Sequence, residues 1–316
     1  MVDLRRLAEE LNIHEISVCH AGRFDDVEAI LLKDEQLGIT PPFVTKEIEK
    51  RVEPKETMKD AASFIVVLEH YHVNSYPKRE GRYGNISPAA CGEDYHRILR
   101  RKLNALVECL KSEDPKSDYL LYVDDSPFSE KHVAMRSGLG KILKNGLFYS
   151  RKAGSRCNIG IILTNKPLEC FKVPEIKDDD LVFAPCLHCK ACLTLCPSGA
   201  LSAFGLNSYQ CVSYLTQKKE ELTQDEEIAM GHQIYGCDVC QKVCPINGVI
   251  GETFDTGMEV SLDELLSMSN KEFKIQFQHT AAGWRGKKQF VKNAEIALKN
   301  MERLDGNMEF QRTSRL

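Results

Sequence analysis

The chain has 316 residues, of which 42% are hydrophobic and 28% are charged, and its formal net charge is -4. This balance is typical of a globular protein long enough for a sizeable core and two domains, and it excludes a global electrostatic attraction to nucleic acid. No apolar run approaches the ~18 residues that a membrane-spanning helix needs.

The cysteine content points to a reducing compartment. A chain with 13 cysteines and no recognisable signal peptide is not expected to keep them as disulfides. The opening sequence, MVDLRRLAEELNIHE, indicates an amphipathic helix. We therefore expect a cytoplasmic protein without a membrane segment.

Residues 1–170 alternate strand-like apolar runs with helical stretches. The apolar runs cover residues 16–19, 63–68, 119–123 and 159–163. Residues 93–109 place Leu99, Leu103, Leu106 and other apolar side chains at helical spacing. Together these elements predict an α/β or α+β domain over residues 1–170.

A segment rich in charge and proline, residues 166–180, predicts a linker into a cysteine-rich domain over residues 171–250. Eight cysteines of that domain form two runs and one isolated member. They are Cys186-x2-Cys189-x2-Cys192-x3-Cys196-Pro197, then Cys211, then Cys237-x2-Cys240-x3-Cys244-Pro245. Short spacers let one loop present three thiolates to a cubane, so this pattern predicts two 4Fe-4S clusters. A zinc ribbon would leave the third cysteine of the first run and both Cys-Pro steps without a role.

The spacing also predicts which cysteines share a cluster. In two-cluster proteins the cysteine before the proline binds the other cluster, and the isolated cysteine supplies the ligand that the second run lacks. One predicted ligand set is Cys186, Cys189, Cys192 and Cys244, and the other is Cys196, Cys211, Cys237 and Cys240. The other thiols are interpreted as core or incidental residues: Cys19, Cys91, Cys109, Cys157 and Cys170.

Beyond the cysteines, apolar positions within residues 262–266, 273–277 and 288–301 predict helices. The fold we expect is an α/β (α+β) catalytic domain, a ferredoxin-like double 4Fe-4S module and a short helical tail over residues 251–316.

The first domain has to use the electrons, because a two-cluster ferredoxin alone needs far fewer residues. Cubane clusters pass single electrons, and their substrates often require a further redox group such as a flavin, a haem or a corrinoid. The segment Gly138-Leu139-Gly140 lacks the third glycine of a dinucleotide fingerprint and follows a predicted helix. The string DYHRIL at residues 94–99 ends in leucine where a histidine-ligated corrinoid site usually has glycine. Any corrinoid would therefore lack such a lower histidine ligand.

The residues carry a resemblance to the epoxyqueuosine reductase family over nearly the whole chain. The strongest strings are CLHCKACLTLCPSGAL at 186–201, CVSYLT at 211–216 and IYGCDVCQKVCP at 234–245. Weaker strings follow in the same order as in the family: KRVEP at 50–54, GEDYH at 92–96, VDDSP at 123–127, RSGLG at 136–140, KN at 144–145 and AGWRG at 282–286.

The resemblance implies that the chain reduces epoxyqueuosine to queuosine in the anticodon loop of transfer RNA. The clusters would feed a base-off cobalamin lying between the first two domains, and Asp124 would contact the corrin and donate a proton. An epoxide oxygen that becomes an alkoxide needs a general acid, and a shielded carboxyl has a raised pKa. Asp125 is the rival donor. From the residues alone, a strand-ending turn over 124–127 is the better interpretation, and the resemblance reverses that preference.

Further cofactor contacts come from the same resemblance. Arg51 matches a family arginine near cobalamin, and Lys144 and Asn145 match a Lys-Asn pair of the glycine-rich loop. Ser213 and Asp238 adjoin predicted cluster ligands, where they either line a path to the corrin or cap the cluster loops. Tyr95 and His96 fit packed helix residues as well as site residues, and they are not assigned to the site.

The implied partners are transfer RNA bearing epoxyqueuosine and an external reductant such as flavodoxin or ferredoxin. Residues 86–92 and 138–145 depart from the family pattern, and the helical repeats that follow residue 301 in many members are not expected here. Two alternatives therefore stay open. One is a related corrinoid reductase of a small epoxide or an organohalide, and the other is an electron-transfer protein without a substrate.

Overall fold

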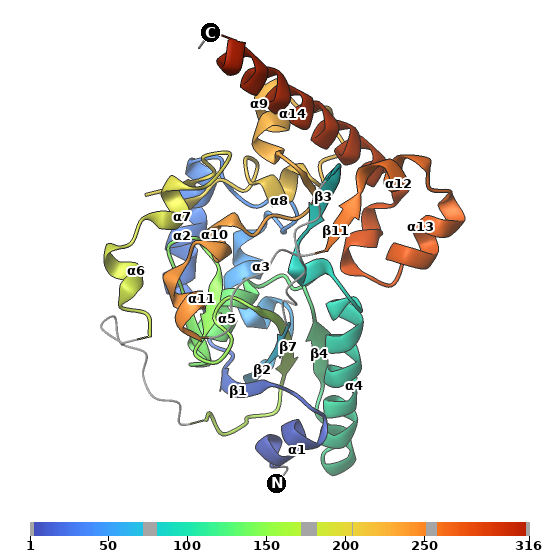
Figure 1. Cartoon of the computed structure of the whole chain (residues 1–316). Coiled ribbons are helices and arrows are strands. Elements are labelled where there is room, and N and C mark those ends of the chain that lie inside the picture. The colour runs from blue at the N-terminus through green and yellow to red at the C-terminus, as the bar shows by residue number, and fades with distance from the viewer. Residues whose placement is uncertain (1–2, 72–80, 172–181, 204, 251–257, 314–316) are drawn as a thin grey trace. The chain divides into compact units, whose positions relative to one another are not determined.

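The computed structural model describes residues 3–71, 81–171, 182–203, 205–250 and 258–313 (Figure 1). Most of the predicted linker and the start of the predicted helical tail lie outside these residues. The chain forms two compact units, each built from separated segments. The first unit comprises residues 1–71, 95–190 and 244–252, and the second comprises residues 72–94, 191–243 and 253–316.

The first unit is built on a four-stranded antiparallel sheet with the order β1-β2-β7-β4. The strands are β1 (Glu15–His20), β2 (Ser63–His70), β4 (Tyr119–Tyr122) and β7 (Cys157–Thr164). Each of them lies on one of the four predicted apolar runs, so these predictions are confirmed. Because the strands are antiparallel and helices cover them, the first unit is of the α+β type.

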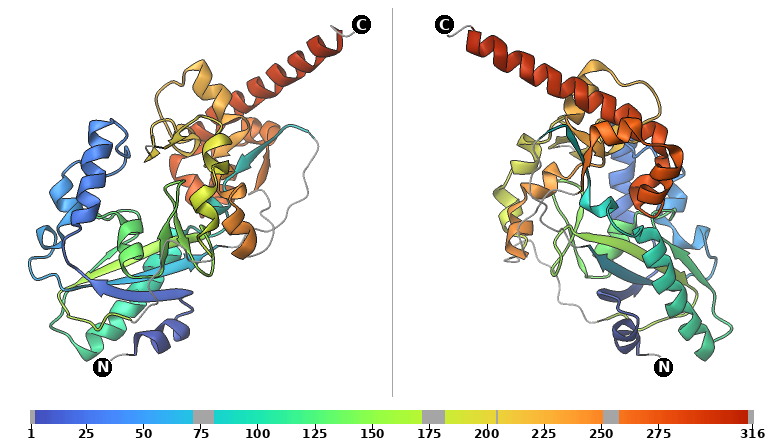
Figure 2. Two further views of the ribbon diagram at one scale, coloured as in Figure 1. Left: turned by 90° about the vertical axis from the view of Figure 1, so that its left-hand side faces the viewer. Right: turned by 45° about the vertical axis from the view of Figure 1, so that its right-hand side comes forward.

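Side chains of β2 alternate between two cores, which is why this strand reads as an unbroken apolar run. On one face, Phe64 and Val66 pack with residues of α2 (Asp25–Gln36), α3 (Ile48–Val52) and α5 (Glu130–Arg136). On the other face, Ile65 and Val67 pack against α1 (Leu4–Glu10) and α4 (Tyr95–Glu113). Figure 2 shows these helices and the sheet from two further sides.

The predicted helix over residues 93–109 is α4, and its buried stripe includes Leu99, Leu103 and Leu106. The glycine at position 160 lets this stripe approach β7, because a Cβ there would lie 3.1 Å from a Leu103 methyl carbon. The remaining elements of this unit are η1 (Pro54–Glu56), β5 (Gly140–Ile142), β6 (Phe148–Ser150), α6 (Pro185–His188) and α11 (Pro245–Ile250).

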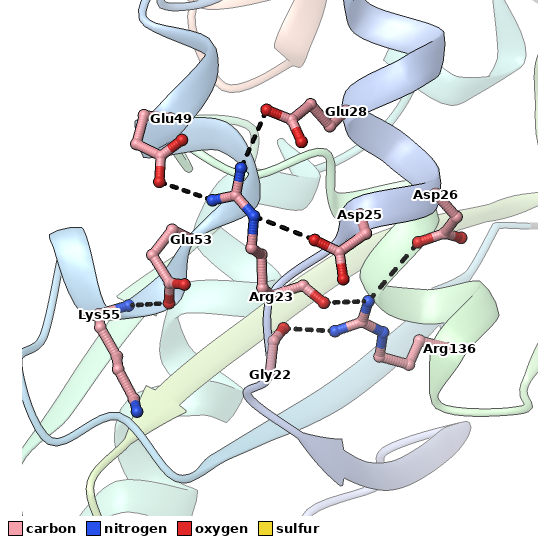
Figure 3. A network of polar contacts seen from close by, with 9 residues as sticks. All are labelled: Gly22, Arg23, Asp25, Asp26, Glu28, Glu49, Glu53, Lys55 and Arg136. Atoms are coloured by element: carbon pink, nitrogen blue, oxygen red, sulfur yellow. Dashed lines mark hydrogen bonds and ion pairs between the residues drawn. The ribbon is translucent and has the colours of Figure 1, made fainter.

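An arginine network ties three helices of the first unit together (Figure 3). The guanidinium of Arg23 contacts Glu49 on α3 at 2.6 Å, and Glu28 and Asp25 on α2 at 2.9 and 3.0 Å. Arg136 at the end of α5 donates to the backbone carbonyl oxygens of Gly22 and Arg23. The arginine in the family string RSGLG thus links α5 to the turn before α2, and Arg23 fixes α3.

The second unit contains a three-stranded sheet with the order β10-β3-β11, in which β10 runs parallel and β11 antiparallel to the central strand. These strands are β3 (Tyr83–Ile86), β10 (Gln233–Tyr235) and β11 (Glu259–Ser261). The three predicted C-terminal helices are confirmed as α12 (Leu262–Ser267), α13 (Asn270–Phe277) and α14 (Lys287–Thr313). In the second unit α14 packs against β10, α12 and α9 (Gln224–Met230).

The remaining elements of the second unit are short. They are η2 (Pro88–Ala90), α7 (Ala191–Thr194), β8 (Leu201–Ser202), β9 (Gly205–Leu206), α8 (Val212–Leu215), α10 (Val239–Lys242) and η3 (Ala281–Arg285). Two of them, α7 and α10, contain cysteines. Among the described residues, no helix is both long and apolar enough to cross a membrane.

Candidate functional site

The loop between β4 and α5 places Asp124 in an unusual backbone conformation. Its φ is 61°, in the left-handed region that residues other than glycine rarely adopt. Aspartate is one of the few side chains that tolerate this region, at a cost of about 1–2 kcal/mol. Such strain persists only where the surroundings hold it in place, and it is common at functional sites.

Two side chains from the first turn of α4 meet the Asp124 carboxylate. The Tyr95 hydroxyl donates a hydrogen bond to Asp124 Oδ2, and His96 Nε2 lies 3.6 Å from the same oxygen. The Tyr95 and His96 rings stack with centroids 4.1 Å apart. The carboxylate stays accessible, with 52% of its side chain exposed. The structure therefore brings to Asp124 two proton-carrying groups that the sequence analysis left unassigned.

Asp125 has a different role in this loop. Its Oδ1 accepts the Val123 backbone N–H at 2.9 Å, and its Oδ2 accepts a hydrogen bond from Arg100. The first bond reaches back two residues to the end of β4, and the second joins the loop to α4. The Asp124 carboxylate contacts Tyr95 and His96 instead.

A further carboxyl group, that of Glu130, lies under the loop. Glu130 Oε1 accepts the Asp124 backbone N–H at 3.0 Å, and the backbone N–H of Ser126 lies near enough to the same carboxylate to lower its pKa. Burial raises the pKa of Glu130 well above its ordinary value, and the nearby negative charges of Asp124 and Asp125 raise it further. Nothing in the local sequence distinguishes Glu130 from any acidic residue in the first turn of a helix.

Arg51 lies at the end of α3 and is only 6% exposed. Its Nε atom is buried and, among the described residues, has no hydrogen-bond partner. Burial lowers the pKa of the Arg51 guanidinium, and the charge of Asp34 partly opposes this effect. A buried guanidinium that the protein does not satisfy fits a contact to a bound cofactor, as the resemblance implies.

Lys144 and Asn145 contact the segment that carries predicted cluster ligands. Lys144 Nζ donates to the backbone oxygens of Leu187 and Cys189, at 2.8 and 3.2 Å. Asn145 is buried and donates from Nδ2 to the Tyr149 hydroxyl at 2.8 Å. Tyr149 in turn packs beside Cys186 and forms a side-chain hydrogen bond with Cys244. Their predicted contact with cobalamin stays a prediction.

Four thiols of the second predicted ligand set face one another within the second unit. Burial raises the pKa of Cys211, Cys237 and Cys240, and the mutual repulsion of the thiols raises each value further. The other predicted ligand set is divided between the two units. Cys192 belongs to the second unit, whereas Cys186, Cys189 and Cys244 belong to the first.

Backbone N–H groups point at these sulfur atoms. The backbone N–H groups of Ser213 and Tyr214, at the start of α8, lie near the Cys211 sulfur and lower its pKa, and the N–H of Val239, at the start of α10, does the same for Cys237. Such N–H groups stabilise thiolates that ligate iron. Within the described ranges no three His, Cys, Asp or Glu side chains converge on one metal ion. A cubane does not require this, since each of its thiolates binds a different iron. The four thiols thus fit a cluster.

Ser213 and Asp238 lie in the cluster loops, as predicted. The Asp238 carboxylate is buried and accepts hydrogen bonds from Ser87 Oγ at 3.1 Å and from Gln241 Nε2 at 2.8 Å. The Ser213 carbonyl oxygen accepts hydrogen bonds from Thr216 and Gln217. Both residues therefore stabilise the loops beside Cys211, Cys237 and Cys240.

Comparisons with known proteins identify the family of the chain. Residues 51–125 match the family model for epoxyqueuosine reductase QueG, and residues 185–247 match that for a 4Fe-4S double cluster binding domain. An epoxyqueuosine reductase from Lactococcus garvieae is 35% identical over 309 residues, which cover 94% of this chain and 86% of that protein. The chain belongs to the epoxyqueuosine reductase family.

Solved structures of this family have the same fold. A crystal structure of an epoxyqueuosine reductase with an epoxyqueuosine-modified stem loop of tyrosine transfer RNA has a TM-score of 0.83 and 33% identity, covering 94% of this chain and 81% of that one. A structure from Bacillus subtilis, in which a catalytic loop named for its aspartate is swung out of the active site, has a TM-score of 0.82 and 32% identity, with the same coverage.

Proposed function

We propose that this epoxyqueuosine reductase family member reduces epoxyqueuosine to queuosine in the anticodon loop of transfer RNA. The observation that carries the proposal is the accessible Asp124 carboxylate, held in a strained loop beside Tyr95 and His96. Support for the substrate comes from the related enzyme that was crystallised with an epoxyqueuosine-modified transfer RNA stem loop.

The reaction removes the epoxide oxygen from the cyclopentane ring. Both carbon–oxygen bonds break, a carbon–carbon double bond forms, and the oxygen leaves as water after uptake of two electrons and two protons. Asp124 is the proposed general acid for the developing alkoxide. The Tyr95 hydroxyl already donates to Asp124, and His96 lies 3.6 Å away, so both are placed to return a proton to the carboxylate.

Two 4Fe-4S clusters are the proposed electron carriers. Cys186, Cys189, Cys192 and Cys244 would bind one cluster, and Cys196, Cys211, Cys237 and Cys240 the other. When bound, cobalamin supplies a strongly reducing cobalt centre that engages the substrate. We propose that Arg51 and Asp124 contact the cobalamin. Lys144, Asn145, Ser213 and Asp238 are the remaining proposed cofactor contacts.

Each turnover consumes two electrons, so an external reductant has to supply them. We propose a reductant of the flavodoxin or ferredoxin type. The number of unpaired thiols fits a reducing compartment, and we propose that the protein acts in the cytoplasm.

Anaerobic reconstitution with iron, sulfide and cobalamin tests the proposal directly. The protein is reduced and incubated with transfer RNA that bears epoxyqueuosine, and the nucleosides are analysed by mass spectrometry. We expect queuosine to form only when both cofactors are present. Bound cobalamin without product would contradict the substrate and indicate a related reductase of another epoxide or an organohalide. Clusters without bound cobalamin would leave an electron carrier.

A further inference from the structure

Side chains of the loop that carries Asp124 contact α4, through Tyr95, His96 and Arg100, but the loop backbone has few bonds to the rest of the protein. Val123 N–H bonds to Asp125 Oδ1, and Phe128 N–H bonds to Ser126 Oγ, both at 2.9 Å. These bonds lie within the loop and shape its turns without fixing it to the core. The backbone N–H of Asp124 instead bonds to the carboxylate of Glu130, which is the first residue of α5, and the Ser126 N–H lies near that carboxylate.

The helix that begins at Glu130 is firmly anchored. Val133 and Ala134 on α5 have no exposed surface and belong to the core beneath the sheet. The Ser129 hydroxyl, which precedes the helix, bonds to His132 Nδ1 at 2.7 Å. Arg136 at the other end joins the network of Figure 3. Through its bond to the Asp124 backbone N–H, Glu130 therefore connects the loop to a rigid element of the first unit.

A carboxylate at this place is costly for the fold. Glu130 faces the negative charges of Asp124 and Asp125, and among the described residues no cation pairs with it. Arg100, on α4, pairs with Asp125. An uncompensated charge in a partly buried position destabilises the folded state. Residues that lower stability in this way are often kept for function.

We propose that Glu130 is a positioning residue, whose carboxylate holds Asp124 in its left-handed conformation within reach of Tyr95 and His96. Loss of this acceptor frees the Asp124 N–H, and the strain at Asp124 then favours other conformations. The Bacillus subtilis relative was solved with its catalytic loop swung out of the active site, so a position of this kind is accessible in that protein. The inference rests on the proposed function of Asp124 and adds what keeps that residue in place.

The test compares Glu130→Ala and Glu130→Gln with the parent protein after cofactor reconstitution. Glu108→Gln is the matched control, because Glu108 is an exposed acid on α4 in the same unit. Hydrogen–deuterium exchange is measured on peptides that cover residues 122–129. We expect exchange in Glu130→Ala to be at least about tenfold faster than in the parent. Glu130→Gln should lie between the two, because its side-chain oxygen still accepts a hydrogen bond.

Turnover of epoxyqueuosine provides the second measurement. In Glu130→Ala, kcat should fall about tenfold or more, while KM for transfer RNA and both cluster spectra stay unchanged. Parent-like exchange and parent-like kcat in Glu130→Ala would overturn the proposal. The exchange measurement does not depend on the substrate. A parent protein that forms no queuosine, but whose loop peptides are protected, would refute the proposed function and not the role of Glu130.

Discussion

The Asp124 loop and the thiol group of the second unit (Cys196, Cys211, Cys237 and Cys240) differ in what contacts their polar side chains. In the loop, the Asp124 carboxylate has its partners from the chain itself: Tyr95, His96 and, through the backbone, Glu130. In the thiol group, Cys237 and Cys240 face other thiols, and this mutual repulsion adds to burial in raising their pKa values. Binding of an iron-sulfur cluster would stabilise the thiolate form of such a group.

The two sites therefore contribute to the protein in different ways. The loop stores backbone strain that the fold of the first unit has to sustain. The thiol group instead couples cluster binding to the stability of the surrounding loops, because thiolates near one another are unfavourable until iron binds them. A substitution in the loop should therefore change catalysis with little effect on cofactor content. A substitution in the thiol group should change both.

The largest effect is expected from the isolated cysteine. Cys211→Ala removes one ligand of the second proposed cluster, so the iron content after reconstitution should fall by about half and turnover should be lost. Cys157→Ala is the control, since burial raises the pKa of that thiol to about 12 and it is therefore inert toward metal. Iron analysis and electron paramagnetic resonance check both variants. A full iron content in Cys211→Ala would show that this ligand was assigned incorrectly.

A smaller and purely catalytic effect is expected from the two neighbouring aspartates. Asp124→Asn keeps a side chain that tolerates a positive φ but removes the acid, so kcat should fall roughly 100-fold or more at unchanged cluster spectra. Asp125→Asn keeps the oxygen that accepts the Val123 N–H and should retain most activity. Single-turnover assays on modified transfer RNA compare the two. Equal losses in both variants would remove the distinction between acid and turn residue.

The smallest effect concerns the pH dependence of stability. The pKa of Glu130 is raised in the folded state, so the fold binds this proton more tightly than the unfolded chain does and loses stability as pH rises through the raised pKa. Glu130→Gln carries no charge there, although Asp124, Asp125, Tyr95, His96 and Arg100 still surround the position. Its unfolding midpoint should exceed that of the parent by about 2 °C or more near pH 8 and match it near about pH 4.

Thermal unfolding at one scan rate, followed by circular dichroism, measures this difference. A constant offset between Glu130→Gln and the parent at every pH would mean that the charge of Glu130 is not its cause.

The two sites also differ in how far they could be predicted from the sequence. Cluster ligands lie close together along the chain, so their spacing reflects the geometry of the cubane. The apolar runs located the strands of the first unit because β2 and its neighbours are buried on both faces. The partners of Asp124 could not be found in this way. Tyr95 reaches Asp124 across 29 positions in the sequence, through the register of α4 against β4.

Residues of the family strings had roles that only the structure reveals. Arg136 binds backbone oxygens before α2, and Lys144 binds those of Leu187 and Cys189. A string match shows that a residue is shared with a family, but whether it contacts a cofactor or another loop depends on tertiary neighbours.

Hydrogen exchange of the same protein with and without its cofactors tests the comparison of the two sites most directly. We predict that peptides covering residues 122–129 are already protected in the cofactor-free protein, because the chain itself completes the Asp124 loop. Peptides that contain Cys211, Cys237 and Cys240 should gain protection only after reconstitution with iron and sulfide. Protection of the Asp124 loop that appears only when cofactors bind would contradict this account.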